Sequence, residues 1–390
     1  MTTARELAPL AVEMRRWRRD LHAHPETAFE EVRTADLVAG LLSSWGIAVH
    51  RGLARTGVVG TLTAGRGNRA IGLRADMDAL NIVERNDFDY ASRHPGKMHA
   101  CGHDGHTAML LGAAAHLARS RGFDGTVHFI FQPAEENQGG GRVMVEDGLF
   151  DRFPCEAVYG MHNMPGIDVG KIAVQDGPAL ASSDSWEAIF KGSGAHGAKP
   201  HQGRDATVAA AQFIVALQTI AARSVDPVEA AVVSVASVSA GDSDTWNVIP
   251  PEVRLRGTAR AFQPQVRDLV DRRLGELARG IAAGLGVEVA CRFIRRNPPV
   301  VNVKANAQIA ARAAASTVGE ANVLRDFPPS TAGEDFSFML QKVPGAYVWL
   351  GIGPGHEGCL HHNPRYDFND DALATGAAYW VSLVETELPG

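Results

Sequence analysis

The sequence predicts an α/β fold into which a smaller α+β domain is inserted. Apolar strand-like runs alternate with helical patterns in the first and last parts of the chain, as in a sheet covered by helices. Near residue 182 this pattern changes to alternating, half-exposed strands, which are typical of an antiparallel sheet. The length of 390 residues also favours two domains, at about 100–200 residues for each.

The first part of the larger domain, which we expect to cover residues 1–181, contains helices and buried strands in turn. Apolar residues at helical spacing predict helices at 5–21, 31–45 and 105–119. Apolar runs that end in polar or glycine-rich turns predict strands at 58–62, 71–73, 127–131 and 157–161. This alternation is the pattern of an α/β domain.

Residues 182–296 are expected to form the inserted domain. Its elements follow the order strand, helix, strand, strand, helix, strand, which is the ferredoxin-like arrangement. We expect its strands at 185–191, 230–238, 252–259 and 287–293, and its helices at 206–222 and 265–283. The α/β pattern resumes in residues 297–390, with a helix near 305–318 and a strand at 346–350.

Composition and charge exclude several classes of function. Lys and Arg number 38 against 44 Asp and Glu, a net charge of −6, which argues against nucleic acid as a partner. We interpret the basic run Arg15, Arg16, Arg18 and Arg19 as the solvated face of a helix. No apolar stretch approaches the ~20 residues of a membrane span, and the N-terminal residues lack the order of a signal peptide. The 4 cysteines are too few and too dispersed for a disulfide framework, so we expect a cytoplasmic protein.

A cysteine and several histidines gather in the segment HACGHDGHT, where Cys101 and His103 lie two residues apart. A thiolate and an imidazole at this spacing can reach one metal ion from a loop beside a helix start. Zinc and similar ions favour such ligands. The structural alternative is a helix N-terminus with incidental histidines.

Further polar side chains directly follow the expected strands; they are Asp76, Asp78, Glu135, Glu136 and His162. Because the carboxyl ends of strands in open α/β sheets meet in one crevice, we expect these groups to share a metal site. Neighbouring carboxylates on an extended segment point to opposite sides, so one of Glu135 and Glu136 can bind metal while the other faces substrate. Either His361 or His362, after the last strand, can complete the site.

A glycine pattern after the same strand raises a different possibility. Gly353, Gly355 and Gly358 match the G-x-G-x-x-G fingerprint of nicotinamide oxidoreductases. Pro364 argues against the helix that must follow this fingerprint, so a dinucleotide site has little support.

The inserted domain carries a second polar cluster, made of His196, His201, Asn247 and Arg260. His196 and His201 lie in the glycine- and proline-containing loop GSGAHGAKPH, where a histidine is usually just solvated. A hydrolase that activates water on a metal nevertheless needs a donor to the developing oxyanion, and a lid domain can supply one.

The chain carries, in this order, the motifs RADMDAL, HPGKMHACGHDGHT, FQPAEE, YGMHNMPG, AGEDFSFM and HHNPRYDFND. These motifs resemble those of the hippurate hydrolase and N-acyl-amino-acid amidohydrolase branch of the aminoacylase and carboxypeptidase G metallopeptidases. Plant auxin-conjugate amidohydrolases belong to the same branch. The resemblance covers nearly the whole chain, and the cysteine–histidine motif is specific to this branch.

The resemblance implies a zinc-peptidase-like α/β catalytic domain with an inserted ferredoxin-like lid that often dimerises. It implies two adjacent divalent ions, with manganese or zinc expected and cobalt or nickel possible. The positions that match metal ligands are Cys101, His103, Glu136, His162 and His362, the last preferred to His361 because Asn-Pro follows it. By the same matching, Glu135 is the general base, Asp78 supports the metal centre, and His196 is a lid histidine that in relatives reaches a partner subunit's site.

The implied reaction is hydrolysis of an N-acyl amino acid, a small molecule, to a carboxylic acid and a free amino acid. Asn247 and Arg260 are candidates for binding the α-carboxylate of the substrate. Two features depart from the family pattern and could alter the pocket: Asn81 stands where proline is usual, and GSGAHGAKPH stands where Gly-Gly-His-Ala is usual.

Two competing functions remain at this point. A metal-dependent aminopeptidase or dipeptidase would need an acidic anchor for the substrate's ammonium group. A non-catalytic metal-binding paralogue would have no need of the base, so the presence of Glu135 beside a full set of ligand positions argues against it.

Overall fold

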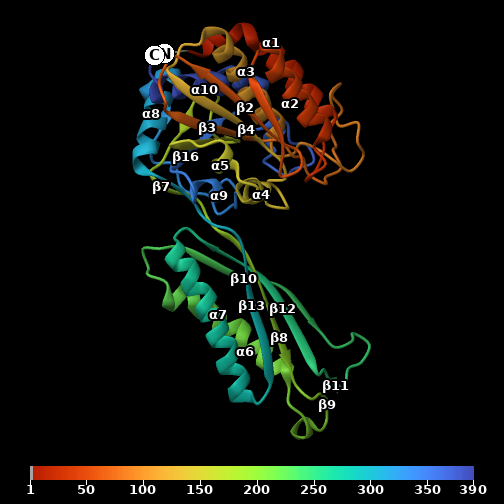
Figure 1. The fold of residues 1–390 in the computed structure, drawn as a ribbon. Coiled ribbons are helices and arrows are strands. Elements are labelled where there is room, and N and C mark those ends of the chain that lie inside the picture. Colours follow the sequence, from red (N-terminus) through yellow and green to blue (C-terminus); the bar gives the residue numbers. More distant parts are fainter. Residues whose placement is uncertain (1–2) are drawn as a thin grey trace. The chain divides into compact units, whose positions relative to one another are not determined.

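The fold is that of a computed structural model, which describes residues 3–390. The chain divides into two compact units (Figure 1). Unit 1 consists of Met1–Ala179, Val301–Pro328 and Asp335–Gly390, and unit 2 consists of Leu180–Val300 and Pro329–Glu334. The chain passes between them through β7 (Gly177–Leu180) and β14 (Val300–Asn302), which pair with each other.

A mixed sheet forms the centre of unit 1, with the strand order β1-β2-β4-β3-β5-β16-β6-β15. Its middle strands β3, β4, β5 and β16 run parallel to their neighbours within this group. The bounds are β1 (Ala48–Leu53), β2 (Gly57–Ala64), β3 (Ala70–Asp76), β4 (Gly125–Gln132), β5 (Ala157–Met164), β6 (Ile172–Ala173), β15 (Val323–Leu324) and β16 (Gly345–Gly351). The parallel strands are buried along nearly their whole length, as expected for strands covered on both faces.

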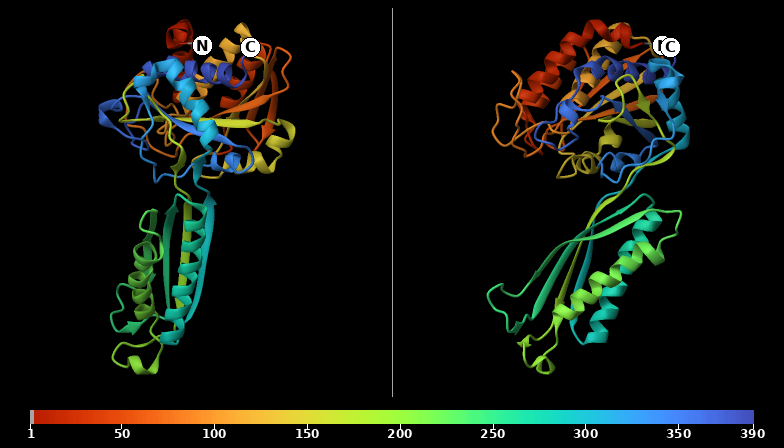
Figure 2. Two further views of the ribbon diagram at one scale, coloured as in Figure 1. Left: turned by 90° about the vertical axis from the view of Figure 1, so that its left-hand side faces the viewer. Right: turned by 180° about the vertical axis from the view of Figure 1, so that it is seen from behind.

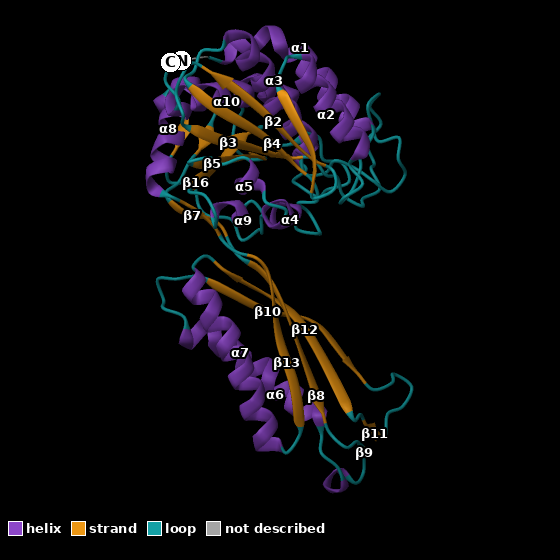
Figure 3. Cartoon of the chain, viewed as in Figure 1, coloured by secondary structure: helices purple, strands orange, loops and turns teal. Residues whose placement is uncertain are grey.

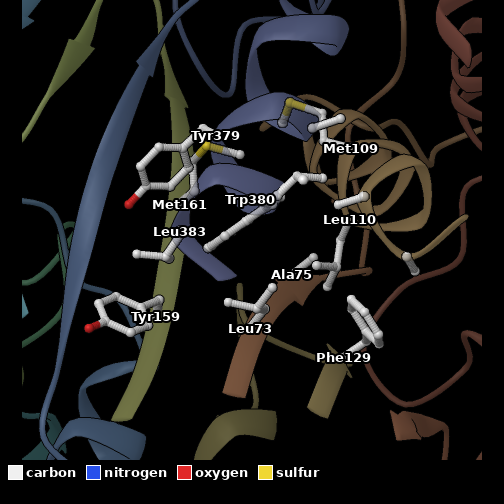
Figure 4. Packing of buried hydrophobic residues seen from close by; sticks show 14 of the residues in the cluster. Leu73, Ala75, Met109, Leu110, Phe129, Tyr159, Met161, Tyr379, Trp380 and Leu383 are labelled. Atoms are coloured by element: carbon white, nitrogen blue, oxygen red, sulfur yellow. The ribbon is translucent and has the colours of Figure 1, made fainter. Parts of the chain in front are cut away.

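Helices cover this sheet on both sides, with the short helices α4, α5 and α9 opposite the long helices α1, α3 and α10 (Figure 3). The bounds are α1 (Ala4–Ala23), α2 (Val32–Ser44), α3 (His103–Ser120), α4 (Gly140–Glu146), α5 (Leu149–Arg152), α8 (Lys304–Val318), α9 (Ser337–Leu340) and α10 (Leu373–Glu387). Between α3, α10 and the central strands lies the core, which includes Leu73, Phe129, Met161, Leu110 and Trp380 (Figure 4).

Unit 2 has the ferredoxin-like order of elements that the sequence predicts. Its antiparallel sheet has the strand order β10-β12-β8-β13, and its helices α6 and α7 both pack on one face (Figure 2). The bounds are β8 (Ser183–Lys191), α6 (Ala206–Thr219), the π-helical turn η2 (Ile220–Ser224), β10 (Ala231–Ala240), β12 (Glu252–Ala261), α7 (Pro264–Leu285) and β13 (Glu288–Asn297). A small ladder pairs β9 (Ala195–His196) with β11 (Val248–Ile249).

The expectation that no apolar stretch approaches a membrane-spanning length is wrong for one segment. Among the described residues, Ala206–Ser224 is long and apolar enough to pass that test by length and composition. One face of this segment packs in the core of unit 2, where Ala209, Phe213 and Leu217 are buried, while Val208 and Val215 are exposed.

The interpretation of the basic run as a solvated face is also wrong at one position. Arg15 and Arg16 are exposed, but Arg18 is fully buried. The Arg18 guanidinium lies 2.9 Å from a carboxylate oxygen of Asp104, in the first turn of α3, and also pairs with Asp367. Helical periodicity turns Arg18 toward α3, and the aspartates there compensate its charge.

Candidate functional site

The core of the candidate site is a thiol and two imidazoles at the carboxyl edge of the central strands. His162 lies near the end of β5, and Cys101 lies in the loop just before α3, whose first residue is His103. The Cys101 Sγ and His162 Nε2 atoms are 3.5 Å apart. One ligand atom from each of these three residues lies within 4.8 Å of the others.

Two acidic residues and a further histidine extend this cluster. Potential ligand atoms of Cys101, Glu136 and His362 lie within 4.8 Å of one another, and so do those of His103, Glu135 and Glu136. The His362 Nε2 atom is 3.2 Å from a Glu136 carboxylate oxygen. All the positions that the sequence matched to metal ligands are therefore brought together.

His361, the alternative to His362, makes a different contact. Its Nε2–H donates to the side-chain oxygen of Asn163 at 2.9 Å, and its ring packs edge-on against His162. Burial, with the positive charges of neighbouring histidines, lowers the pKa of His361 to about 3, so its ring is neutral. His361 thus binds Asn163 beside the cluster, while His362 contacts Glu136.

Asp78 holds two members of the cluster in place. The His103 Nδ1–H donates to the Asp78 backbone carbonyl at 2.9 Å, and the Glu136 backbone N–H donates to the Asp78 carboxylate at 3.0 Å. The other ring nitrogen of His103 is buried and has no hydrogen-bond partner in the described part of the chain. An imidazole with one nitrogen anchored by a carboxylate and the other left free is the usual arrangement of a metal-binding histidine.

The electrostatics of these groups follow from their burial and from the carboxylates around them. Burial raises the pKa of the Cys101 thiol well above its usual range, and the charges of Glu136 and Glu135 raise it further. Burial lowers the pKa of His103, but Asp76 and the hydrogen bond to Asp78 outweigh this effect and raise it to about 10. Burial lowers the pKa of His162 well below its usual value.

The donor set therefore fits a divalent transition metal. It combines a soft thiol, imidazole nitrogens and carboxylates, and it includes the orphaned nitrogen of His103. Sulfur and nitrogen donors suit zinc and its neighbours, whereas carboxylate oxygens also suit manganese. Two overlapping groups of ligand atoms are enough to hold adjacent ions.

His106 offers another possible ligand group with Asp76 and His103, but its nitrogens are already used. Its Nδ1–H donates to the Asp76 carboxylate at 2.6 Å, and its Nε2 accepts the backbone N–H of Asn163 at 3.0 Å. His106 thus ties the ends of β3 and β5 together rather than presenting a free lone pair.

Glu135, the expected base, lies next to this cluster and contacts a segment distant in sequence. The Asp335 backbone N–H lies 3.4 Å from a Glu135 carboxylate oxygen. The Asp335 side chain accepts from the buried guanidinium of Arg74 at 3.2 Å and from the Gln132 amide at 2.7 Å. Sequence reasoning assigned no role to Arg74, Gln132 or Asp335, although Arg74 is in RADMDAL, Gln132 in FQPAEE and Asp335 in AGEDFSFM.

The candidate residues of unit 2 fall into two places. His196 lies on β9, and the Gly197 N–H next to it donates to the Asn247 carbonyl at 2.6 Å, so His196 and Asn247 are neighbours. Arg260 lies near the C-terminal end of β12, where its guanidinium donates to the Ala259 carbonyl at 2.8 Å. Within unit 2, the structure therefore groups His196 with Asn247 and separates Arg260 from them.

This fold and the thiol–imidazole–carboxylate cluster are those of a metallopeptidase family. The profile of Peptidase family M20/M25/M40 matches residues 72–386, so the chain belongs to this family. It is 39% identical over 378 residues to hippurate hydrolase of Campylobacter jejuni, covering 97% of each chain. It is 38% identical over 368 residues to N-acetylcysteine deacetylase of Bacillus subtilis, covering 94% of each chain.

A solved structure extends the likeness to three dimensions. The Bacillus subtilis YXEP protein, described as a dinuclear metal binding peptidase from the M20 family, superposes with a TM-score of 0.86 at 36% identity. The match covers 97% of this chain and 99% of that chain. These similarities confirm the family and the α/β fold that the sequence motifs indicated.

Proposed function

We propose that the protein is a metal-dependent amidohydrolase that cleaves N-acyl amino acids to a carboxylic acid and a free amino acid. The observation that carries this proposal is the convergence of Cys101, His103 and His162 with Glu135 and Glu136 at one edge of the sheet. Relatives named hippurate hydrolase, N-acetylcysteine deacetylase and N-acetyldiaminopimelate deacetylase support the substrate class.

In this proposal Cys101, His103, Glu136, His162 and His362 hold two divalent cations. Manganese or zinc is the expected metal, with cobalt or nickel as alternatives. Such ions, when bound, lower the pKa of a water molecule and polarise the amide carbonyl. Asp78 orients His103 through the Nδ1 contact, so that Nε2 would be left to bind a cation.

The remaining steps belong to side chains. Glu135 accepts a proton from the attacking water and delivers it to the leaving amine. His196 donates a hydrogen bond to the oxyanion of the tetrahedral intermediate. Asn247, the neighbour of His196, is the proposed partner of the substrate's α-carboxylate. Arg260 lies apart from both within unit 2, so we do not assign it to the same carboxylate.

We further propose that the inserted domain, expected at 182–296, is a lid and dimerisation domain. Its strand β10 lies at the edge of the sheet in the described part of unit 2, and it contains ten residues without a charge. Val232 and Val238 on this strand are exposed. Long uncharged edge strands tend to pair with another chain, and a second copy is the occupant that we propose. All four cysteines are free, which suits a reducing, cytoplasmic location.

A substrate screen tests the activity. The metal-reconstituted protein is incubated with N-acetyl-, N-benzoyl- and indoleacetyl-amino acids, and with dipeptides that have a free amino terminus, while released amino acid is measured. Hydrolysis of the N-acyl compounds that disappears in Glu135→Gln supports the proposal. Hydrolysis of the dipeptides alone would replace it by a dipeptidase or aminopeptidase activity.

A further inference from the structure

Asn163, which directly follows His162 on β5, uses every polar atom of its side chain within the candidate site. The residue is fully buried. Its amide nitrogen donates to the Cys101 backbone carbonyl at 2.7 Å. Its side-chain oxygen accepts from the Tyr366 hydroxyl at 2.7 Å and from His361 at 2.9 Å. One side chain therefore connects the loop of Cys101 to the segment that carries His361 and His362.

The backbone of Asn163 acts on His162. The His162 Nδ1–H donates to the Asn163 carbonyl at 2.7 Å, which fixes the tautomer in which Nε2 carries the lone pair. The same Nε2 atom lies 3.5 Å from the Cys101 sulfur. Asn163 thus holds both the backbone of Cys101 and the ring of His162, and the Cys101 thiol faces the His162 Nε2 atom.

The side chains of Asn163 and Tyr366 pack closely against Gly102. Gly102 has a φ of +93°, and an added Cβ would lie 2.3 Å from the Asn163 amide nitrogen and 2.7 Å from the Tyr366 hydroxyl oxygen. Only glycine fits both the left-handed conformation and this space. The loop of Cys101 can therefore approach Asn163 closely enough to accept its hydrogen bond.

We propose that Asn163 is a positioning residue that preforms the Cys101–His162 pair and thereby makes the centre selective for soft divalent cations such as zinc over hard ones such as manganese. This inference rests on the proposed metal site, but it concerns cation selectivity and not the identity of the substrate. The physical reason is that a thiolate contributes more to binding a soft ion than a hard one. Misplacing the sulfur should therefore weaken zinc binding more than manganese binding.

Two variants displace the Cys101 loop in different ways. Asn163→Asp keeps the acceptor for Tyr366 and His361 but replaces the donor to the Cys101 carbonyl by a second oxygen. Gly102→Ala keeps the chemistry of Asn163 but places a methyl group against its amide nitrogen, which pushes the Cys101 loop away from it. Tyr366→Phe is the matched control, because it removes one hydrogen bond to Asn163 and leaves the donor to Cys101 in place.

Competition titrations with a chromophoric chelator measure the zinc and manganese affinities of the full-length chain. We expect zinc binding to weaken about 10–100-fold in Asn163→Asp and Gly102→Ala, which is the usual effect of losing a residue that orients a ligand. Manganese binding should change less, and Tyr366→Phe should retain most of the zinc affinity.

The absorption spectrum of the cobalt-loaded protein gives a second measurement, which would not change if Asn163 only stabilised the fold. Cobalt-loaded parent protein should show the thiolate-to-cobalt charge-transfer band of Cys101, and Cys101→Ser should lack it. The band should be reduced in both displacing variants while their metal-free circular dichroism spectra match that of the parent. If Asn163→Asp does not fold, Gly102→Ala decides by the same assays.

An unchanged zinc-to-manganese ratio and a full cobalt band in a folded displacing variant would overturn the proposal. These assays contain no substrate, so their outcome is independent of the proposed activity. A protein that shows the expected shifts but hydrolyses no N-acyl amino acid would retain the inference and refute the proposed function.

Discussion

His103 is anchored by Asp78 through one ring nitrogen, while the other makes no hydrogen bond within residues 3–390 and faces the ligand cluster. The Nδ1 atom lies 2.9 Å from the Asp78 carbonyl oxygen and 3.2 Å from its carboxylate. The Nε2 atom has its nearest Glu136 carboxylate oxygen at 3.9 Å. With a pKa of about 10, set by burial against the charges of Asp76 and Asp78, the metal-free ring carries a proton at neutral pH. A cation bound at Nε2 would displace that proton.

Metal loading should therefore release about two protons per chain at pH 7, one from His103 and one from the Cys101 thiol, whose pKa is raised by burial and by the charge of Glu136. Metal affinity should accordingly rise with pH through the neutral range. Calorimetric titration in buffers of different ionisation enthalpy measures the release.

Cys101→Ser should release about one proton and lose its preference for soft ions, because a serine hydroxyl is a harder and far less acidic ligand. Equal release by both proteins would contradict the role of Cys101.

Glu31→Gln should stabilise the metal-free protein at pH 8 and leave it nearly unchanged at pH 5. Burial, and next the charge of Asp78, raise the pKa of Glu31 from 4.5 to about 7. Between these values the folded chain holds a proton that the unfolded chain has lost, so the free energy of unfolding falls as pH rises from about 4.5 to about 7. This loss in the free energy of unfolding persists above pH 7 and amounts to at most about 3 kcal/mol.

Chemical denaturation at several pH values measures this difference. Glu30→Gln is the matched control, because Glu30 is exposed and the hydrogen bond from Lys97 lowers its pKa. The free energy of unfolding of Glu30→Gln, relative to that of the parent, should not rise between pH 5 and pH 8. A Glu31→Gln protein whose stability follows that of the parent at every pH would show that Glu31 is already ionised at pH 5.

The sequence located the candidate site because its members follow strands. Glu136 follows β4 and His162 lies near the end of β5, where the topology of an α/β sheet alone brings them together. Arg18, Arg74 and Asn163 were missed for a different reason. Their burial results from how α1 meets α3 and how β3 meets β4 and β5, and no local pattern marks a buried arginine or asparagine. For Arg74 and Asn163, their position within the quoted motifs was the available signal.

Glu135→Gln should retain its metals and lose at least about 10²-fold in kcat, the lower end of general-base effects. The amide has nearly the shape of the carboxylate but cannot accept the proton of the attacking water. Metal content by elemental analysis and turnover of the best N-acyl substrate are measured on the same preparation. Near-normal turnover at full metal content would remove Glu135 from this role.

Arg18→Met should destabilise the protein by about 3–5 kcal/mol, the usual effect of removing one partner of a buried ion pair. The substitution preserves the side chain's length but leaves the Asp104 and Asp370 carboxylates without their buried cation. Arg16→Met is the control on the same helix, because Arg16 is exposed and pairs at 2.7 Å with the surface residue Glu13. Its effect should stay within about 1 kcal/mol. Equal denaturation midpoints for the two variants would show that the Arg18 network contributes no net stability.

His196→Ala should lower kcat about 10²–10³-fold, as the loss of one oxyanion donor does. Its effect on KM should be smaller, because the hydrogen bond strengthens only after charge has developed on the carbonyl oxygen. The exposed ring of His196 on β9 receives a hydrogen bond from the Ala198 backbone N–H at Nδ1, at 3.0 Å, which leaves Nε2 as the available donor. His201→Ala is the matched control, since His201 is an exposed histidine of the same loop to which we assign no role.

If a second copy supplies this donor, mixing His196→Ala with Glu135→Gln protein should restore part of the activity. Each mixed dimer then contains one site in which both the base and the donor are intact. Subunit exchange is verified with differently tagged chains. If two copies pair along β10, Val238→Lys should abolish both the exchange and the recovery of activity, because Val238 is exposed on that edge strand. Exchange without recovered activity would exclude the cross-subunit role, because complementation requires only that the two intact groups meet. An unchanged kcat in His196→Ala would exclude the catalytic role altogether and leave His196 as a solvated loop histidine.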